Sequence, residues 1–287
     1  MAHLAESRVA TMRFGGFTAV DSVDLTVSSR EVVGLLGANG AGKTTVIRML
    51  LGLLTPTRGS VTLFGHPPSR ATRRRVGYVP QTLGLYDDLT VRENWAFTGA
   101  AFGTKGRNLP ASIANSGHEL VGELPLGLQK RVAFAVAFSH DPDLLILDEP
   151  TSGVGPLSSS RLWEDIRSSA EDGTGVLVTT HNMEEAEQCD RLIVMVSGRV
   201  VAAGTLSEVI GSRQVLEVQC DDWREAFAAL DADGIMVQVQ GGRLRVPGTP
   251  DQVGKLLQRH QLTGKVTAVS ADLEEAFVGI VTTTSRQ

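Results

Sequence analysis

Short apolar runs alternate with amphipathic stretches along the first part of the chain, up to about residue 211. Residues 32–36, 144–147 and 176–180 are clear examples of such runs. An uninterrupted apolar run is typical of a strand that is buried on both faces of a parallel sheet. Because strands that alternate with helices indicate an α/β architecture, the pattern predicts an α/β sheet core over residues 1–211.

The pattern changes near residue 212, where we expect a second and smaller domain to begin. Beyond this point it predicts strands at 215–220, 235–239, 244–246 and 266–269, and helices at 223–230, 251–259 and 273–281. Up to the last strand, the order β-α-β-β-α-β is the split βαβ, ferredoxin-like arrangement. We therefore expect residues 212–287 to form a small α+β accessory domain, in which we recognise no catalytic motif.

The composition is that of a soluble chain with one full hydrophobic core and one small one. The chain has 287 residues, of which 21% are charged, and a formal net charge of −5, so nothing indicates non-specific binding to nucleic acid. Its only cysteines, Cys189 and Cys220, are far apart, which favours a reducing compartment over a disulfide framework or a zinc site. The N-terminus lacks the layout of a signal peptide, and apolar runs such as residues 132–138 are too short to span a bilayer. If a membrane is involved, we expect another chain to cross it.

A glycine-rich segment follows the apolar run at residues 32–36. It consists of Gly37, Ala38, Asn39, Gly40, Ala41, Gly42, Lys43, Thr44 and Thr45. The three glycines are expected to adopt positive φ and turn backbone N–H groups onto one anion, and a helix that opens at Lys43 adds the pull of its N-terminus. We expect Lys43 to reach the β- and γ-phosphates and the Thr44 hydroxyl to hold Mg²⁺. The strand before and the helix after favour a phosphate-binding loop over a turn that binds nothing, so the segment predicts binding of a nucleoside triphosphate.

Two carboxylates, Asp148 and Glu149, end the apolar run at residues 144–147. The carboxyl end of a buried parallel strand opens onto the ligand crevice, and therefore beside the phosphate loop. Asp148 is expected to coordinate Mg²⁺, directly or through water, and Glu149 to polarise the attacking water. An acidic strand end that only caps a neighbouring helix is the alternative, and the phosphate loop disfavours it.

His181 and Gln81 are two further candidates at the same edge. His181 follows the run at 176–180, and could hydrogen-bond the γ-phosphate and the water. Gln81 follows residues 77–80, and its amide could contact Mg²⁺ and water. Taken alone, a histidine after a strand is more often structural, and Gln81 could be a plain surface residue.

The chain resembles the ATP-binding-cassette (ABC) ATPase family over roughly residues 8–211. The motifs that carry the resemblance follow one another in the family's order: the phosphate loop, Gln81, residues 124–131, Asp148 with Glu149, and His181. Residues 151–154, 179–191 and 273–277 are similar to ATPase subunits of bacterial drug and antibiotic exporters. The resemblance implies a P-loop ATPase fold, ATP and Mg²⁺ as ligands, and hydrolysis coupled to transport. It also implies an ATPase dimer, homo- or heterodimeric, that docks as a peripheral subunit on a separate integral-membrane permease at the cytoplasmic face of the inner membrane.

The family also implies roles for positions outside the central motifs. An aromatic residue stacks on adenine ahead of the phosphate loop, and Phe14 is the candidate, with Phe17 next. Core packing is an equally open interpretation of either ring. Gln81 matches the loop that senses the γ-phosphate, and residues 83–94 match part of the permease-docking surface. Within them, residues 90–93 read as a capping box that predicts a helix start.

The signature segment departs from the family pattern. It reads Leu-Pro-Leu-Gly-Leu at residues 124–128, where the family has Leu-Ser-Gly-Gly-Gln and contacts the ATP of the opposite subunit. Pro125 has neither a hydroxyl nor an N–H, and Leu126 adds a side chain where close approach is needed. Gly127 alone stands at its expected place, so Leu126 and Gly127 are the candidate contacts. A helix that begins at the proline could still offer amides to the anion.

Two more departures concern the dimer and the helical subdomain. Gly155 stands where the family has an aspartate that reaches the partner's phosphate loop. The helical subdomain, at about residues 90–140, is expected to be reduced, because residues 103–117 are poor in helical periodicity. The chain thus retains the catalytic residues of its own ATP site, whereas the signature segment that it would contribute to the partner's site lacks family residues. A non-identical second ATPase would leave one strong site, and a homodimer would have two weakened sites.

Two other functions remain as alternatives. The first is a soluble, non-transport ABC protein that acts on nucleic acid or ribosomes. The basic residues at 70 and 73–75 are the only basic cluster, which we interpret as a solvated helix face, so we expect no nucleic-acid partner. The second is a regulatory subunit that binds ATP but hydrolyses it weakly beside a second ATPase, and the presence of Glu149 argues against it.

Overall fold

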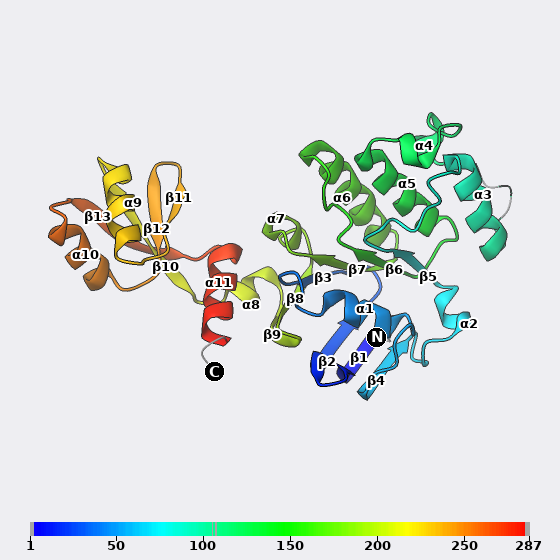
Figure 1. The fold of residues 1–287 in the computed structure, drawn as a ribbon, viewed down its shortest axis with the longest axis horizontal. Helices are drawn as coiled ribbons and strands as arrows, with labels where there is room; N and C mark the ends of the chain where they lie inside the picture. The colour runs from blue at the N-terminus through cyan, green and yellow to red at the C-terminus, as the bar shows by residue number, and fades with distance from the viewer. Residues whose placement is uncertain (1–2, 105, 107, 285–287) are drawn as a thin grey trace. The chain divides into compact units, whose positions relative to one another are not determined.

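A computed structural model describes residues 3–104, 106 and 108–284 of the chain (Figure 1). The chain forms two compact units that divide between Leu206 and Ser207, a few residues before the boundary expected from the sequence. Each unit has its own sheet or sheets and its own buried core.

The first unit is built around a six-stranded sheet with the order β5-β6-β7-β3-β8-β9. Its strands are β3 (Val32–Leu36), β5 (Val76–Val79), β6 (Leu144–Asp148), β7 (Gly175–Thr180), β8 (Arg191–Val196) and β9 (Arg199–Gly204). All neighbours pair in parallel except β9, which runs antiparallel to β8. Strands β3, β6 and β7 are buried at every position, which confirms the α/β core predicted from their apolar runs.

The register of these strands positions the candidate site. Leu36 at the end of β3 pairs with Thr180 of β7, and Asp148 at the end of β6 pairs with Thr179. The carboxyl ends of β3, β6 and β7 therefore meet at one edge of the sheet, where the chain leaves each strand in a loop.

A second sheet covers one side of the first unit (Figure 1). It is antiparallel, with the order β2-β1-β4, and its strands are β1 (Ala5–Phe14), β2 (Phe17–Val27) and β4 (Arg58–Leu63). Helix α1 (Lys43–Leu50) begins at Lys43 as predicted and buries Val46, Ile47, Met49 and Leu50. These side chains share one hydrophobic core with residues of both sheets, so the helix that follows the phosphate loop is fixed by packing on two sides.

Helices cover the opposite face of the six-stranded sheet (Figure 1). They are α3 (Val91–Phe102), α4 (Ala111–Ala114), η1 (Val121–Glu123), α5 (Leu126–Phe138) and α6 (Pro156–Glu171). The chain also forms three short helices, α2 (Arg70–Arg73), α7 (Met183–Ala186) and α8 (Leu206–Ile210). The capping box at α3 is confirmed, since the Thr90 hydroxyl accepts from the Glu93 N–H at 3.2 Å and the Glu93 carboxylate accepts from the Thr90 N–H at 2.8 Å. The bond from the Thr90 backbone lowers the pKa of Glu93. Residues 103–117 were predicted to be poor in helix. Among the residues of this segment that the structure describes, which exclude positions 105 and 107, α4 is the only helix.

The second unit has a four-stranded antiparallel sheet with the order β11-β12-β10-β13. Its elements are β10 (Gln214–Cys220), α9 (Trp223–Ala232), β11 (Gln238–Gln240), β12 (Arg243–Val246), α10 (Pro250–Arg259), β13 (Gly264–Ser270) and α11 (Leu273–Thr284). The prediction of a strand over residues 235–239 is wrong for its first part. Gly234 has a φ of 75° and the Ile235 N–H donates to the Leu230 carbonyl at 3.0 Å, so these residues close the C-terminus of α9 instead.

Candidate active site

The loop between β3 and α1 is shaped by its glycines. Gly40 and Gly42 have φ of 82° and 101°, and Gly42 forms the N-cap of α1. A Cβ on Gly42 would lie 2.6 Å from the Ala19 carbonyl oxygen. The prediction of positive φ is wrong for Gly37, which is not among the described positive-φ glycines; there a Cβ would lie 2.5 Å from the Met195 carbonyl oxygen, so close approach, not φ, requires glycine.

Lys43 is buried inside the curve of this loop. Its Nζ donates to the carbonyl oxygens of Gly37 at 2.7 Å and Ala38 at 3.3 Å, and it lies 3.4 Å from Glu149 Oε1. The first turn of α1 contains no acidic side chain, so nothing in it competes for the positive end of the helix dipole. The loop therefore offers an anion a fixed ammonium group and a helix N-terminus together.

Asp148 connects two strands to the helix at the phosphate loop. Its Oδ2 accepts from the Thr44 hydroxyl at 3.0 Å, and its Oδ1 accepts from the Thr179 hydroxyl at 2.6 Å. The carboxylate is buried, and these hydroxyls satisfy both of its oxygens.

The donor chemistry at Thr44 and Asp148 fits Mg²⁺. A hydroxyl and a carboxylate oxygen lie side by side, and Mg²⁺ prefers oxygen ligands from one or two carboxylates, water and substrate phosphates. In the described part of the chain, no group of three or more His, Cys, Asp or Glu residues could hold a metal by itself. These two residues could hold the ion only together with oxygens from a bound phosphate and water.

The carboxylate of Glu149 brings the other predicted residues together. Its Oε1 lies 3.4 Å from Lys43 Nζ and 3.4 Å from His181 Nδ1, and its Oε2 accepts from Gln81 Nε2 at 3.4 Å. Glu149 also has a φ of 49°, in the left-handed region, and its N–H donates to Thr179 Oγ1 at 3.0 Å. A non-glycine residue in this region carries strain that the surrounding contacts must hold, and such strain is common at functional sites.

His181 and Gln81 lie at the mouth of the site, where both side chains reach solvent. The loop and β7 are joined below them, since the Gly37 N–H donates to the Thr180 carbonyl at 3.2 Å. The structure thus places His181 and Lys43 at one oxygen of the Glu149 carboxylate and Gln81 at the other.

A cavity of about 440 Å³ opens over the phosphate loop. Lys43, Thr44, Gln81 and Glu149 line it, and Phe14 and Phe17 line its side. The two residues are 47% and 65% exposed and are paired across the turn between β1 and β2. Neither ring packs in the core, so both are available to stack on a planar base.

The signature residues lie apart from this cavity. Among the described residues that line it, neither Leu126 nor Gly127 occurs. They open α5 behind the N-cap residue Pro125, and a Cβ on Gly127 would lie 2.4 Å from the Ser158 hydroxyl oxygen. Gly155 is the N-cap of α6, and an added Cβ there would meet no atom within 4 Å in the described part of the chain. The chain's own site therefore does not use these positions.

Two buried charged residues beside the site were missed by the sequence reasoning. Lys130 of α5 donates to the Glu149 carbonyl oxygen at 3.3 Å, and burial lowers its pKa, against the opposing effect of nearby carboxylates. Glu185 of α7 accepts from the hydroxyls of Thr151 and Thr180, the latter at 2.7 Å. The apolar sequence of α5 around Lys130 was a signal that this helix is buried. Nothing in the four-residue α7 marks Glu185 as buried, because a glutamate is normally exposed.

The chain is similar in sequence and in fold to ATP-binding proteins of ABC transporters. The family model described as ABC transporter matches residues 20–152. The chain is 41% identical over 212 residues to the probable multidrug ABC transporter ATP-binding protein YbhF of Escherichia coli, an alignment that covers 70% of this chain and 37% of that protein. It is 44% identical over 222 residues to the Nod factor export ATP-binding protein I of Burkholderia lata, covering 73% and 72%. A solved ATP-binding subunit of an ABC transporter superposes with a TM-score of 0.67 at 30% identity, covering 72% of this chain and 91% of that one.

Proposed function

The chain belongs to the ABC transporter family of ATP-binding proteins and is an ATPase, and from this premise we propose that it powers a membrane exporter. The observation that carries the proposal is the convergence of Lys43, Gln81 and His181 on the Glu149 carboxylate, each at 3.4 Å, over a phosphate loop. This is the arrangement needed to hold a γ-phosphate and an attacking water in line.

The nucleotide is ATP in this proposal, held with Mg²⁺. The amides of residues 37–45 and the ammonium of Lys43 cradle the phosphates, and Phe14 stacks on adenine, with Phe17 as the other candidate. Thr44, Asp148 and Gln81 would hold the ion together with oxygens of the phosphates and water. When bound, Mg²⁺ supplies a positive charge against which the phosphate oxygens are positioned.

The residues around Glu149 have separate roles in hydrolysis. Glu149 orients the water and accepts its proton, and His181 holds the water and the γ-phosphate in line. Lys43 stabilises the negative charge that develops on the phosphoryl oxygens. Lys130 and Thr179 position the backbone of Glu149 through its carbonyl and N–H, which keeps the carboxylate aimed at the mouth of the loop.

Export through a separate permease is supported by the names of the relatives, which describe a multidrug transporter and a Nod factor exporter. No helix in the described part of the chain has both the length and the apolar character to cross a bilayer. We therefore propose a peripheral subunit at the cytoplasmic face of the inner membrane, serving a permease for drug-like, antibiotic or lipid-like molecules. Its docking surface is residues 83–94 with Phe97, where Tyr86 and Phe97 are 50% and 55% exposed and their rings meet edge to face at 5.2 Å.

A second ATPase subunit completes the working unit in this proposal. Leu126 and Gly127 lie outside the chain's own cavity, which suits contacts with the ATP of a partner. Because Pro125 and Gly155 cannot supply a hydroxyl or a carboxylate there, a heterodimer would have one strong site and one weak site, and a homodimer two weakened ones.

The second unit is a split βαβ, ferredoxin-like accessory domain in this proposal. The support is its element order and its antiparallel sheet, in which β10 and β12 are the central strands. The boundary near residue 211 follows from the same assignment.

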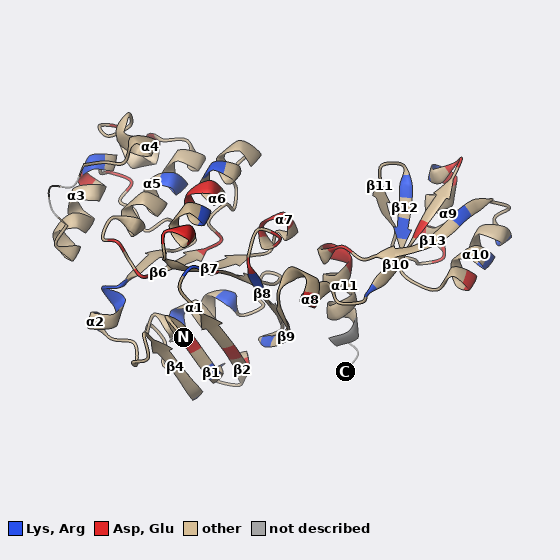
Figure 2. Cartoon of the chain, turned by 180° about the vertical axis from the view of Figure 1, so that it is seen from behind, with Lys and Arg blue, Asp and Glu red and all other residues tan. Residues whose placement is uncertain are grey.

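A function on nucleic acid has less support. Basic and acidic residues are interspersed over both units (Figure 2). Within the basic cluster at residues 70–75, Arg75 pairs with Asp143 at 2.8 Å and lies over the Phe64 ring, and Arg73 donates to the Leu51 carbonyl oxygen. Internal contacts thus occupy part of the cluster, whereas phosphate recognition needs a basic stripe that is free to contact a backbone.

The proposed function can be tested by purification with and without the permease. The chain would be co-expressed with candidate six-span membrane proteins, and ATP hydrolysis and membrane retention measured. The proposal expects retention with the permease and a stimulated turnover that Glu149→Gln abolishes. Retention on nucleic acid at physiological salt, with no membrane association, would contradict it.

A further inference from the structure

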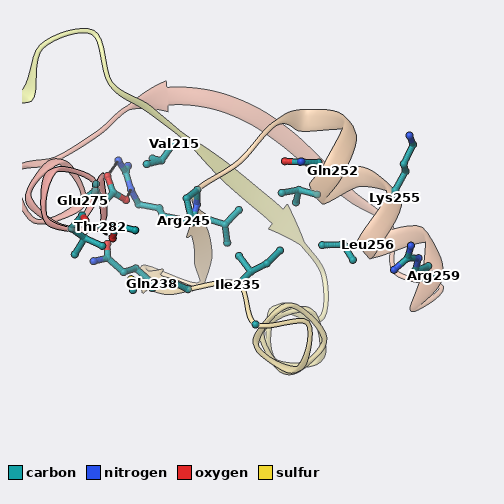
Figure 3. A pocket seen from close by; sticks show the side chains of 17 residues that line it. Val215, Ile235, Gln238, Arg245, Gln252, Lys255, Leu256, Arg259, Glu275 and Thr282 are labelled. Atoms are coloured by element: carbon teal, nitrogen blue, oxygen red, sulfur yellow. Dashed lines mark hydrogen bonds and ion pairs between the residues drawn. The ribbon is translucent and has the colours of Figure 1, made fainter. Parts of the chain in front are cut away.

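The second unit contains a cavity of about 840 Å³ that is remote in sequence from the nucleotide motifs. Figure 3 shows it between α10, which carries Gln252, Lys255 and Leu256, and α11, which carries Glu275 and Thr282. Residues of β10, β11 and β12 line it between the two helices. Its volume is within the range of small-molecule pockets, about 300–1,000 Å³.

The lining of this cavity is mainly apolar. Ile235, Met236, Val246, Leu256 and Val278 contribute to it. Val246 is fully buried and Leu256 packs against the core of the unit, while Met236 is exposed. The cavity therefore has a rigid apolar wall on the core side and an adaptable methionine on the solvent side, which suits a ligand with an apolar body.

Some charged side chains of the cavity form an ion pair and others do not. Arg245 makes two hydrogen bonds to Glu275, at 2.7 and 2.8 Å, and a third to the Ser270 carbonyl oxygen, and the bond from Glu275 raises the pKa of Arg245. This pair cancels its own charge. Lys255 and Arg259, in contrast, make no ion pair of 4 Å or less with any described residue.

The two unpaired cations share one face of α10. They are four positions apart, so their side chains are neighbours on the helix. Both are exposed and belong to the rim of the cavity, and Figure 3 shows the extended Lys255 side chain directed outward from α10. An apolar pocket with two uncompensated positive charges at one end is complementary to a molecule with an apolar body and an acidic head.

We propose that this cavity binds a small amphipathic anion: a monomeric organic acid with an alkyl or aryl body. The apolar body lies against Leu256 and Val278, and the acidic group meets Lys255 and Arg259. The site is independent of the nucleotide site, so the proposal stands or fails separately from the proposed function.

A cavity-filling variant gives the first test. Gly279 of α11 lines the cavity, and an added Cβ would meet no atom of the described residues within 4 Å, so Gly279→Phe should place its ring in the cavity. Gly254 of α10 is a matched control, since an added Cβ there also meets nothing within 4 Å and the residue is not among those that line the cavity. Replacing a helical glycine does not lower helix propensity, and thermal melts of both variants check that each folds.

The probe is sodium decanoate below its aggregation concentration, titrated calorimetrically into the full chain. We expect saturable binding at one site per chain, lost in Gly279→Phe and kept in Gly254→Phe. Lys255→Gln with Arg259→Gln should weaken binding by about tenfold or more, the loss expected for charge-assisted hydrogen bonds. Lys265→Gln, an exposed lysine on β13, should leave binding unchanged.

Three outcomes would overturn the proposal. One is the absence of saturable decanoate binding, and another is equal binding by Gly279→Phe and the wild type. The third is equal affinity for decanol and decanoate, because the charges would then contribute nothing. Vesicles of anionic phospholipid distinguish the source of the acid: binding to vesicles without binding to monomeric decanoate would indicate a membrane surface and not this pocket.

Discussion

Thr44 and Asp148, which are 104 positions apart in the chain, are joined by a 3.0 Å hydrogen bond between Oγ1 and Oδ2. The bond connects the first turn of α1 to the end of β6. Thr179 holds the other carboxylate oxygen at 2.6 Å. The two oxygens proposed to bind Mg²⁺ are therefore already adjacent, and little rearrangement is needed for both to reach one ion.

Removing the Thr44 hydroxyl should weaken the use of Mg²⁺ more than the binding of nucleotide. Thr44→Val keeps the shape of the side chain but loses one oxygen ligand. We expect the Mg²⁺ concentration for half-maximal hydrolysis to rise by about tenfold or more, the scale of one lost interaction with a charged group. Titration of Mg²⁺ at fixed ATP measures this. Thr267→Val, in the second unit, is the control, and an unchanged Mg²⁺ requirement in Thr44→Val would contradict the assignment.

Lys43 and Glu149 are in contact, but substituting each should have a different effect on ATP binding and on turnover. Lys43→Ala removes the cation that faces the loop, so binding and turnover should fall together. Glu149→Gln keeps the volume and should retain ATP binding while turnover falls by about 10²-fold or more, the usual contribution of a general base. Equilibrium binding of a fluorescent ATP analogue and steady-state hydrolysis distinguish the two.

The control for Glu149→Gln is Glu187→Gln, which changes an exposed carboxylate in the segment that follows His181 in the chain. If Glu149→Gln left turnover at the wild-type rate, the chain would hydrolyse ATP by another route, and its role as the base would be lost.

Glu185 is expected to act as a positioning residue. Its buried carboxylate accepts from hydroxyls at the loop after β6 and at the end of β7, next to His181. Glu185→Ala leaves two hydroxyls without an acceptor and removes a negative charge near Lys130, which should cost about 1–3 kcal/mol of unfolding free energy. Urea unfolding measures the loss.

A purely structural role would not change catalysis at temperatures where the variant is fully folded. We therefore also expect kcat to fall in Glu185→Ala with little change in ATP affinity, and to recover partly in Glu185→Gln. Glu184→Ala, an exposed neighbour on the same helix, should change neither quantity. A loss of stability with an unchanged kcat would limit Glu185 to the fold.

Substitutions in the signature segment are expected to raise ATP turnover. Pro125→Ser with Leu126→Gly restores a hydroxyl and a close backbone approach, and serine is also a better N-cap for α5 than proline is. If the chain works as a homodimer, its turnover should rise by about tenfold, as expected for a regained hydrogen bond to a charged group. ATPase assays of the chain alone measure this, and high cooperative turnover in the unmodified chain would remove the case for an eroded signature.

Much of the fold could be predicted because its signals are local. The apolar runs of β3, β6 and β7, the start of α1 at Lys43 and the capping box of Thr90 and Glu93 all depend on neighbours in sequence, and the structure confirms them. The closeness of Lys43, Glu149 and His181 follows from parallel strands that end at one edge. The roles given to these residues stay predictions.

The errors and omissions depend on contacts between distant segments. Gly37 is glycine because the backbone of Met195 approaches it, which no local pattern reveals. Residues 235–237 are a short apolar run that also suits a strand, but they close α9, and Ile235 and Val237 then pack against the core of the second unit. Glu185 is buried because hydroxyls at two other segments satisfy its carboxylate, and only tertiary structure brings them together.

The most direct test of the central claim is a crystal structure with Mn²⁺ in place of Mg²⁺ and a non-hydrolysable ATP analogue, with the metal located by its anomalous scattering. We expect one peak within bonding distance of Thr44 Oγ1 and an Asp148 oxygen, and a triphosphate enclosed by residues 37–45 with its γ-phosphate beside Glu149. A triphosphate bound elsewhere, or a metal peak away from both oxygens, would contradict it.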